Sequence, residues 1–421
     1  MTPVASQLGP RRAAVVFILI TVMLDVLSFG VVIPVLPKLV EGFLSGDTAS
    51  AAEVYGWMAT AWAFMQFVCS PIQGALSDRF GRRPVVLLSN LGLGLDYVFM
   101  ALAPHVAWLF VGRVISGMAS SSFSTAGAYI ADVTPPEQRA AAFGKMGVAF
   151  GLGFILGPAV GGLLGAVDPR LPFWGAAATS LLNACYGFFV LPESLAREKR
   201  MDFAWKRANP VGSLALLRSH HELTGLATTS FLMNLAHLAL PSVGVLYLSY
   251  RYGWGTTAVG LALAAVGLFA MIVQGGLVRT VTAKFGERRT LLAGLLCGGA
   301  GFSVYGLAST GWLYCAGIPI MALWGLAFPA AQALMTRHVG ASEQGQLQGA
   351  IASLTGIAGL VGPALFTQTF SRFIDQDRLW QLPGAPYLLA SLMLCGAAAI
   401  AWRATKPVAA RADGAKMADH G

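Results

Sequence analysis

The chain has 421 residues, of which 56% are hydrophobic and 11% are charged, and its mean hydropathy is +0.66. Because a soluble domain carries about 25% charged residues, this composition excludes a soluble protein and indicates an integral membrane protein. The net charge of +9 requires no nucleic-acid partner, since basic residues beside membrane spans face anionic lipid headgroups.

Apolar segments of spanning length recur along the whole chain. A transmembrane helix needs about 20 predominantly apolar residues. The first segment follows Arg11 and Arg12 and is too long for a cleaved signal peptide, so we expect it to be retained. The sequence therefore predicts an all-α membrane protein with twelve transmembrane helices, at residues 13–36, 51–76, 84–103, 106–130, 141–166, 172–191, 221–249, 256–279, 290–309, 312–336, 344–371 and 384–403.

Three charged residues, Asp25, Asp96 and Arg113, fall well within these predicted spans. Each costs about 2.5–3.5 kcal/mol on insertion scales, so each needs a partner or a function. A buried carboxyl group can take up and release protons, and a nearby guanidinium opposes its protonation. We therefore predict that Asp25 and Arg113, with Asp96 as a further candidate, couple protonation to conformational change. A static ion pair between Asp25 and Arg113 is the alternative.

A charged, glycine-containing turn with the sequence GALSDRFGRR separates the second span from the third. Glycine permits a tight turn, and an aspartate here can accept hydrogen bonds from arginines or from a helix start in another part of the chain. The alternative is that the arginines only fix the orientation of the chain in the membrane. This alternative explains the arginines, but it explains neither the aspartate nor the glycine spacing. We predict a gating contact made by Gly74, Asp78, Arg79, Gly81, Arg82 and Arg83, with Asp132 at the end of the fourth span as a partner for Arg82 or Arg83.

The fifth span contains a run of small residues around a proline. Small residues at four-residue spacing let helices approach closely, and a proline removes a backbone hydrogen bond and bends its helix. A general glycine packing face is the alternative, but the full run is more specific than two isolated glycines. The residues concerned are Gly153, Gly157, Pro158, Gly161 and Gly162. Their pattern resembles a fifth-helix motif associated with antiporters.

One long polar connection, Pro192 to His220, divides six predicted spans from six others. The halves resemble each other, because residues 284–289 follow the eighth span as residues 79–83 follow the second. Most Lys and Arg residues lie in alternate connections, which places both termini in the cytoplasm. The sequence thus predicts two pseudo-symmetric halves, residues 1–191 and 221–403, with a cytoplasmic linker at 192–220 and a disordered cytoplasmic tail at 404–421.

An internal repeat of this kind predicts a substrate cavity between the halves, near the bilayer midplane. A carboxylate there would attract a cationic or metal-chelated substrate, and aromatic side chains would form a wall. Single His, Gln and aromatic residues in a helical bundle also serve as ordinary packing residues. The candidate cavity residues are Gln66, Asp96, His237, Trp324, Phe328 and Gln332.

Together these features resemble the major facilitator superfamily, and within it the tetracycline–proton antiporters of the drug-efflux branch. The residues that carry the resemblance are Asp25 with Pro34 and Pro37, Gln66, the 74–83 loop, Asp96, Tyr97, Arg113, and residues 128–132, 153–162, 191–194 and 345–349. The resemblance implies the major facilitator fold and a secondary transporter in the bacterial cytoplasmic (inner) membrane. It further implies one functional chain and export of a drug, as a divalent-metal chelate, in exchange for protons.

The sequence departs from this family at two positions of the second half. The family carries a carboxylate in helix nine and a histidine in helix eight, whereas residues 290–309 and 256–279 contain neither. Proton coupling would then rest on Asp25, Arg113 and Asp96. An uptake symporter or facilitator for a metabolite, and a non-transporting receptor, are the alternative functions; the 153–162 motif argues against the first.

No motif in the sequence indicates an enzyme. We find no phosphate-binding loop, no dinucleotide fingerprint and no Cys/His spacing typical of a metal site. We therefore expect no cofactor and no resident metal. A proton gradient, rather than ATP, is the expected source of energy.

Overall fold

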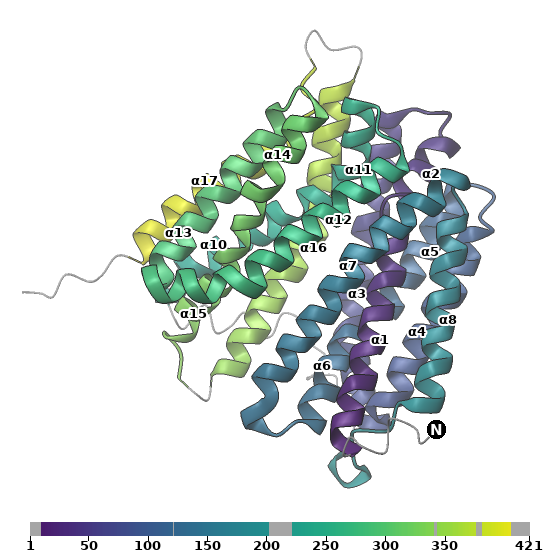
Figure 1. Cartoon of the computed structure of the whole chain (residues 1–421), viewed down its shortest axis with the longest axis vertical. Coiled ribbons are helices and arrows are strands. Elements are labelled where there is room, and N and C mark those ends of the chain that lie inside the picture. The colour runs from purple at the N-terminus through teal and green to yellow at the C-terminus, as the bar shows by residue number, and fades with distance from the viewer. Residues whose placement is uncertain (1–9, 121, 202–220, 341–342, 376–380, 406–421) are drawn as a thin grey trace, which may run out of the picture.

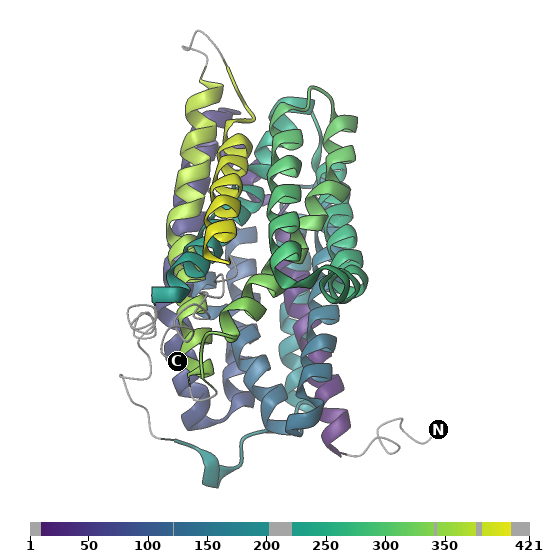
Figure 2. The same cartoon turned by 90° about the vertical axis from the view of Figure 1, so that its left-hand side faces the viewer.

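The computed structural model describes residues 10–120, 122–201, 221–340, 343–375 and 381–405. These residues form a helical bundle and contain no β-strand (Figure 1). The predicted tail from residue 406 onwards, and the part of the predicted linker at 202–220, lie outside the described residues. The linker residues 197–199 lie at the same end of the molecule as Pro10, the first described residue, in both views (Figures 1 and 2).

The helices follow the predicted spans closely, but several spans are divided into two helices. Pro34, which lacks a backbone N–H, lies in the turn that divides the first span. The helices before the linker are α1 (Pro10–Val32), α2 (Leu36–Phe43), α3 (Thr48–Phe80), α4 (Arg82–Ala101), α5 (Val106–Ala119), α6 (Ser122–Val133), α7 (Arg139–Val167) and α8 (Leu171–Val190). Short 3₁₀ turns form at Pro136–Gln138 and Arg197–Lys199.

The helices after the linker continue the bundle. They are α10 (His221–His237), α11 (Ala239–Tyr252), α12 (Thr256–Ile272), α13 (Val278–Leu307), α14 (Gly311–Ala322), α15 (Ala327–Thr336), α16 (Gln344–Ile374) and α17 (Ala385–Ala404). A π-helical turn at Val273–Leu277 joins α12 to α13, and a 3₁₀ turn at Leu323–Leu326 joins α14 to α15.

Ten stretches of the described residues are long and apolar enough to cross a membrane. One of them, Thr256–Leu307, has 52 residues and would be about 78 Å long as a straight helix. Because the hydrocarbon core is about 30 Å thick, this stretch must reverse direction, and Gly286 (φ 76°) interrupts the helix within it. The more polar α3 is not among the ten. The all-α membrane class is confirmed, and the count of twelve spans stays a prediction.

The glycine run of the fifth span lies where three helices cross. A Cβ on Gly161 would overlap the carbonyl oxygen of Val31 on α1, and one on Gly162 would overlap backbone atoms of α12. The close approach of α7 to both α1 and α12 therefore depends on these glycines. Since α12 comes after the linker, this contact joins the two parts of the chain that the sequence predicts to be separate halves.

A second contact between these parts closes the end of the bundle opposite the start of α1 (Figure 1). There α3 packs against α16, and a Cβ on the buried Gly56 would overlap Thr367. Ser371 Oγ donates a hydrogen bond to Glu53 Oε1 at 3.2 Å. The Tyr55 hydroxyl donates to the Pro241 carbonyl at 3.3 Å.

Candidate functional site

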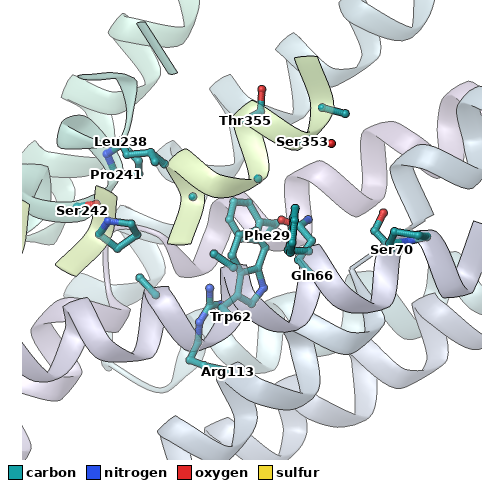
Figure 3. A pocket seen from close by; sticks show the side chains of 18 of the residues that line it. Phe29, Trp62, Gln66, Ser70, Arg113, Leu238, Pro241, Ser242, Ser353 and Thr355 are labelled. Atoms are coloured by element: carbon teal, nitrogen blue, oxygen red, sulfur yellow. The ribbon is translucent and has the colours of Figure 1, made fainter. Parts of the chain in front are cut away.

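A cavity of about 530 Å³ lies between the two parts of the bundle. One wall comes from α1, α3 and α5, and the opposite wall comes from α16 and the junction of α10 with α11 (Figure 3). We call it the main cavity. Its lining residues include Phe29, Tyr55, Trp62, Gln66, Phe67, Ser70, Arg113, Leu238, Pro241, Ser242, Ser353 and Thr355.

The lining of the main cavity combines aromatic rings with hydroxyl and amide groups. Gln66 was predicted from the sequence, whereas Tyr55, Trp62 and Ser70 were not. All four lie on α3 at successive spacings of seven, four and four residues, which places them on one face of the helix. That spacing is the signal that identifies them. Among the described lining residues Arg113 carries the only formal charge, so the cavity suits a largely aromatic molecule that bears hydrogen-bond acceptors.

A second cavity of about 270 Å³ lies within the helices that precede the linker. We call it the inner cavity. Asp25 lines it, together with Tyr97, Ser116 and two phenylalanines of α7. The two cavities share four lining residues: Phe29, Trp62, Gln66 and Arg113.

Arg113 and Asp96 are both buried between α4 and α5. Arg113 is 7% exposed and Asp96 is 2% exposed, and the two groups interact electrostatically. The Arg113 guanidinium lies 5.1 Å from the centre of the Trp62 ring. Neither carboxylate oxygen of Asp96 has a hydrogen-bond partner among the described residues. The structure thus brings Asp25 and Arg113 to one cavity and places Asp96 behind Arg113, outside the lining of both cavities.

The other predicted cavity residues gather at a different place. His237, Trp324 and Phe328 form an aromatic cluster, with ring centres 5.5 Å apart for His237 and Trp324 and 5.4 Å apart for Trp324 and Phe328. Gln332 is exposed and donates to Gln348 at 3.2 Å. None of the four lines the main or the inner cavity, and their role in binding substrate stays a prediction.

The charged turn between α3 and α4 centres on Arg82. Its guanidinium contacts Asp78 Oδ1 at 2.5 Å and Asp132 Oδ2 at 3.1 Å, so Asp132 does lie against Arg82. Gly81 has φ 108°, which favours glycine. Gly74 instead lies inside α3, with open space around its Cβ position. Arg79 lies against Phe80, and Arg83 donates to the Phe188 carbonyl.

Glu193, just after α8, holds this turn in place. Its carboxylate accepts hydrogen bonds from the backbone N–H groups of Arg82, at 2.9 Å, and Arg83, at 3.3 Å. These are the first residues of α4, where free N–H groups and the helix dipole favour a negative charge. A Cβ on Gly81 would overlap the same carboxylate. Glu193 is therefore a cap for α4 that the sequence did not single out.

Replacing Glu193 with Ala is expected to loosen the start of α4. Loss of a capping side chain costs about 0.5–2 kcal/mol. We expect faster amide hydrogen exchange at Arg82 and Arg83, with little change in the rest of α4. Glu198→Ala, an exposed glutamate in the same connection, is the control. Unchanged exchange at both amides in Glu193→Ala would show that the cap does not hold the turn.

The part of the chain that the structure describes contains no group of three or more His, Cys, Asp or Glu residues that could hold a metal ion. The chemistry that the site does offer is a protonatable carboxyl group beside a guanidinium and an aromatic binding cavity.

Known proteins resemble this chain over most of its length. It is 38% identical to the class C tetracycline resistance protein of Escherichia coli, over 89% of this chain and 95% of that protein. It is 35% identical to the class G tetracycline resistance protein of Vibrio anguillarum, over 86% and 91% of the two chains. The crystal structure of the human organic anion transporter MFSD10 (TETRAN) shares the fold, with a TM-score of 0.69, 23% identity, and coverage of 94% of this chain and all of that chain.

A family model decides the classification. The model of the Major Facilitator Superfamily matches residues 18–363, which is most of the chain. This match agrees with the all-helical fold, with the cavity between two sets of helices and with the charged turn after α3. The chain is thus a multi-pass membrane transporter rather than an enzyme, and it belongs to the Major Facilitator Superfamily.

Proposed function

We propose that this protein exports a drug-like small molecule across the bacterial cytoplasmic membrane in exchange for protons. Compounds of the tetracycline class, carried as chelates of a divalent metal, are the first candidates. In this proposal both termini face the cytoplasm and a single chain is the functional unit. The resemblance to several tetracycline resistance proteins supports the choice of drug class.

One observation carries the proton-coupled part of the proposal: the main cavity adjoins the inner cavity that Asp25 lines. Arg113 lines both cavities, so it would interact both with substrate in the main cavity and with the Asp25 carboxyl group in the inner cavity. A guanidinium stabilises a nearby carboxylate and disfavours its protonated form. A substrate that interacts with the Arg113 guanidinium therefore alters how strongly this group disfavours the protonated form of Asp25. Substrate binding and proton release can then depend on each other.

Alternating access requires that each end of the main cavity opens in turn. With the termini in the cytoplasm, the contacts of Glu53, Tyr55 and Gly56 close the outer end. The Arg82 contacts with Asp78 and Asp132 lie at the cytoplasmic end. We propose that these contacts hold the turn between α3 and α4 in a conformation that contacts the second half of the transporter when the cytoplasmic end closes.

Everted membrane vesicles test this function. Respiration acidifies the vesicle lumen, and an antiporter that moves a drug inward releases protons from the lumen. We expect tetracycline with Mg²⁺ to raise the lumenal pH, measured with a fluorescent pH probe, in vesicles that contain the protein and not in vesicles that lack it. A lumenal pH that stays unchanged across tetracyclines, fluoroquinolones and phenicols would contradict the proposal. A further fall in pH would favour symport instead.

A further inference from the structure

The boundary between the two cavities consists of a small set of side chains. Residues of the second half line the main cavity, whereas every lining residue of the inner cavity comes from α1, α3, α4, α5 or α7, or from the turn after α5. Asp25 belongs only to the inner cavity. The residues that contact both cavities, and so connect a bound substrate most directly with the cavity of Asp25, are Phe29, Trp62, Gln66 and Arg113.

Trp62 is the residue of this boundary that contacts two of the others through its ring. The rings of Trp62 and Phe29 are stacked, with centres 5.8 Å apart and an angle of 24° between their planes. The Arg113 guanidinium lies 5.1 Å from the centre of the same Trp62 ring, and Figure 3 shows these side chains next to one another. An aromatic face attracts a cation, more strongly where water is excluded, so the indole ring stabilises the buried charge of Arg113.

The backbone of Trp62 packs closely against α5, whereas its side chain faces the main cavity. A Cβ on Gly117 of α5 would lie 2.6 Å from the Trp62 carbonyl oxygen and 3.1 Å from its Cα. This close packing resists movement of the α3 backbone toward α5 at this point. The Trp62 ring itself is only partly buried and faces the main cavity. An aromatic substrate can therefore take its place against Phe29 by stacking.

The charges around Arg113 determine how a movement of the ring affects the proton site. Asp25 on α1, Asp96 and Tyr97 on α4, and Tyr55 on α3 are the titratable groups near it, while α7 contributes two phenylalanines. A guanidinium that loses its aromatic neighbour needs another stabilising partner. The carboxylate of Asp25 can be that partner. When it forms, the O–H bond of the protonated carboxyl group breaks and the proton passes to water in the inner cavity. The negative charge stays on Asp25, in the cavity that Arg113 also lines.

We propose that Trp62 is the positioning residue that transmits substrate binding to the proton site. Its ring separates the two cavities when no substrate is bound, and a substrate that displaces it favours proton release from Asp25 through Arg113. This inference rests on the proposed drug–proton antiport. Trp62 acts through Arg113, so its loss should alter coupling more than affinity.

Calorimetric titration of the purified full-length protein with tetracycline and Mg²⁺ tests this role. Titrations in buffers with different ionisation enthalpies yield both the affinity and the number of protons released per bound drug. We expect Trp62→Leu to bind the drug with an affinity within a few fold of the wild type but to release fewer than half as many protons. Trp62→Phe, which keeps an aromatic ring, should retain release. Phe67→Leu is the matched control, because Phe67 is on α3 and lines only the main cavity; it should weaken binding without changing the proton count.

The outcomes separate the two proposals. A wild-type protein that binds the drug and releases no protons would contradict the antiport function. Normal release from the wild type and the same number of protons from Trp62→Leu would overturn the role of Trp62 alone. If Trp62→Leu does not yield folded protein, Phe29→Leu is the second variant, because it removes the other ring of the stacked pair, which lies on α1. Full proton release by that variant would overturn the proposal equally.

Discussion

Replacing Asp25 with Asn is expected to abolish proton-coupled transport and to leave folded protein in the membrane. The amide keeps the size and polarity of the side chain, so packing in the inner cavity should persist. It cannot bind or release a proton, so the inner cavity loses the carboxyl group that is proposed to titrate beside Arg113. In everted vesicles, drug-induced alkalinisation of the lumen should fall to the level of vesicles without the protein.

Asp47→Asn is the matched control for this substitution. Asp47 lies outside the membrane spans and caps α3, accepting hydrogen bonds from the backbone of Ala49 and Ser50. The side-chain hydrogen bond from Ser50 lowers the pKa of the Asp47 carboxyl group, so this aspartate is charged at neutral pH. Asn caps helices about as well as Asp, and activity should be retained. Full proton coupling in Asp25→Asn would remove Asp25 from the mechanism.

Replacing Gly56 with Thr is expected to stop transport by keeping the outer end of the main cavity open. Both Gly56 and Thr367 are fully buried, and even a Cβ at Gly56 would overlap Thr367. The two helices can accommodate the added side chain only by separating, which would also break the hydrogen bond between Ser371 and Glu53. Ser371→Cys, combined with this substitution, should then react with a membrane-impermeant maleimide added from outside.

Two further variants make this result interpretable. Gly42→Thr introduces the same side chain at the same end of the molecule, where a Cβ meets nothing within 4 Å, and transport should continue. Exchanging the two side chains, by combining Gly56→Thr with Thr367→Gly, should restore part of the activity because the overlap is removed. Slow maleimide labelling of Ser371→Cys in the Gly56→Thr background, equal to that in the wild-type background, would show that this contact does not close the outer end.

The contact between Arg82 and Asp78 could be predicted from the sequence because it is local, while the gating role of the turn stays a prediction. Arg82 contacts Asp78 four residues away in the same turn, and Gly81 adopts the left-handed conformation that its position requires. The cap from Glu193 was not predicted, because 111 residues separate it from Arg82 in the chain. Whether two residues so far apart in the chain form a hydrogen bond depends on where the end of α8 lies in space relative to the start of α4.

The cavity was predicted less completely. Gln66 was predicted from the sequence, but Trp62 was not. Trp324 was selected as a cavity aromatic; in the structure it is 3% exposed and packs in the core of the second half. The composition of a helix does not reveal its rotation about its own axis, and that rotation decides which side chains face the cavity.

The sequence alone determined that this protein lies in a membrane as a bundle of helices, because the length and apolarity of each segment are local properties that the bilayer selects. It also identified the charged residues Asp25, Asp96 and Arg113, whose cost in the membrane requires a partner or a function. Only the tertiary structure decided that Asp25 lines an inner cavity distinct from the main cavity. The two cavities meet at residues that include Trp62 and Arg113. That arrangement results from packing between α1, α3 and α5, whose contacts join residues far apart in the chain.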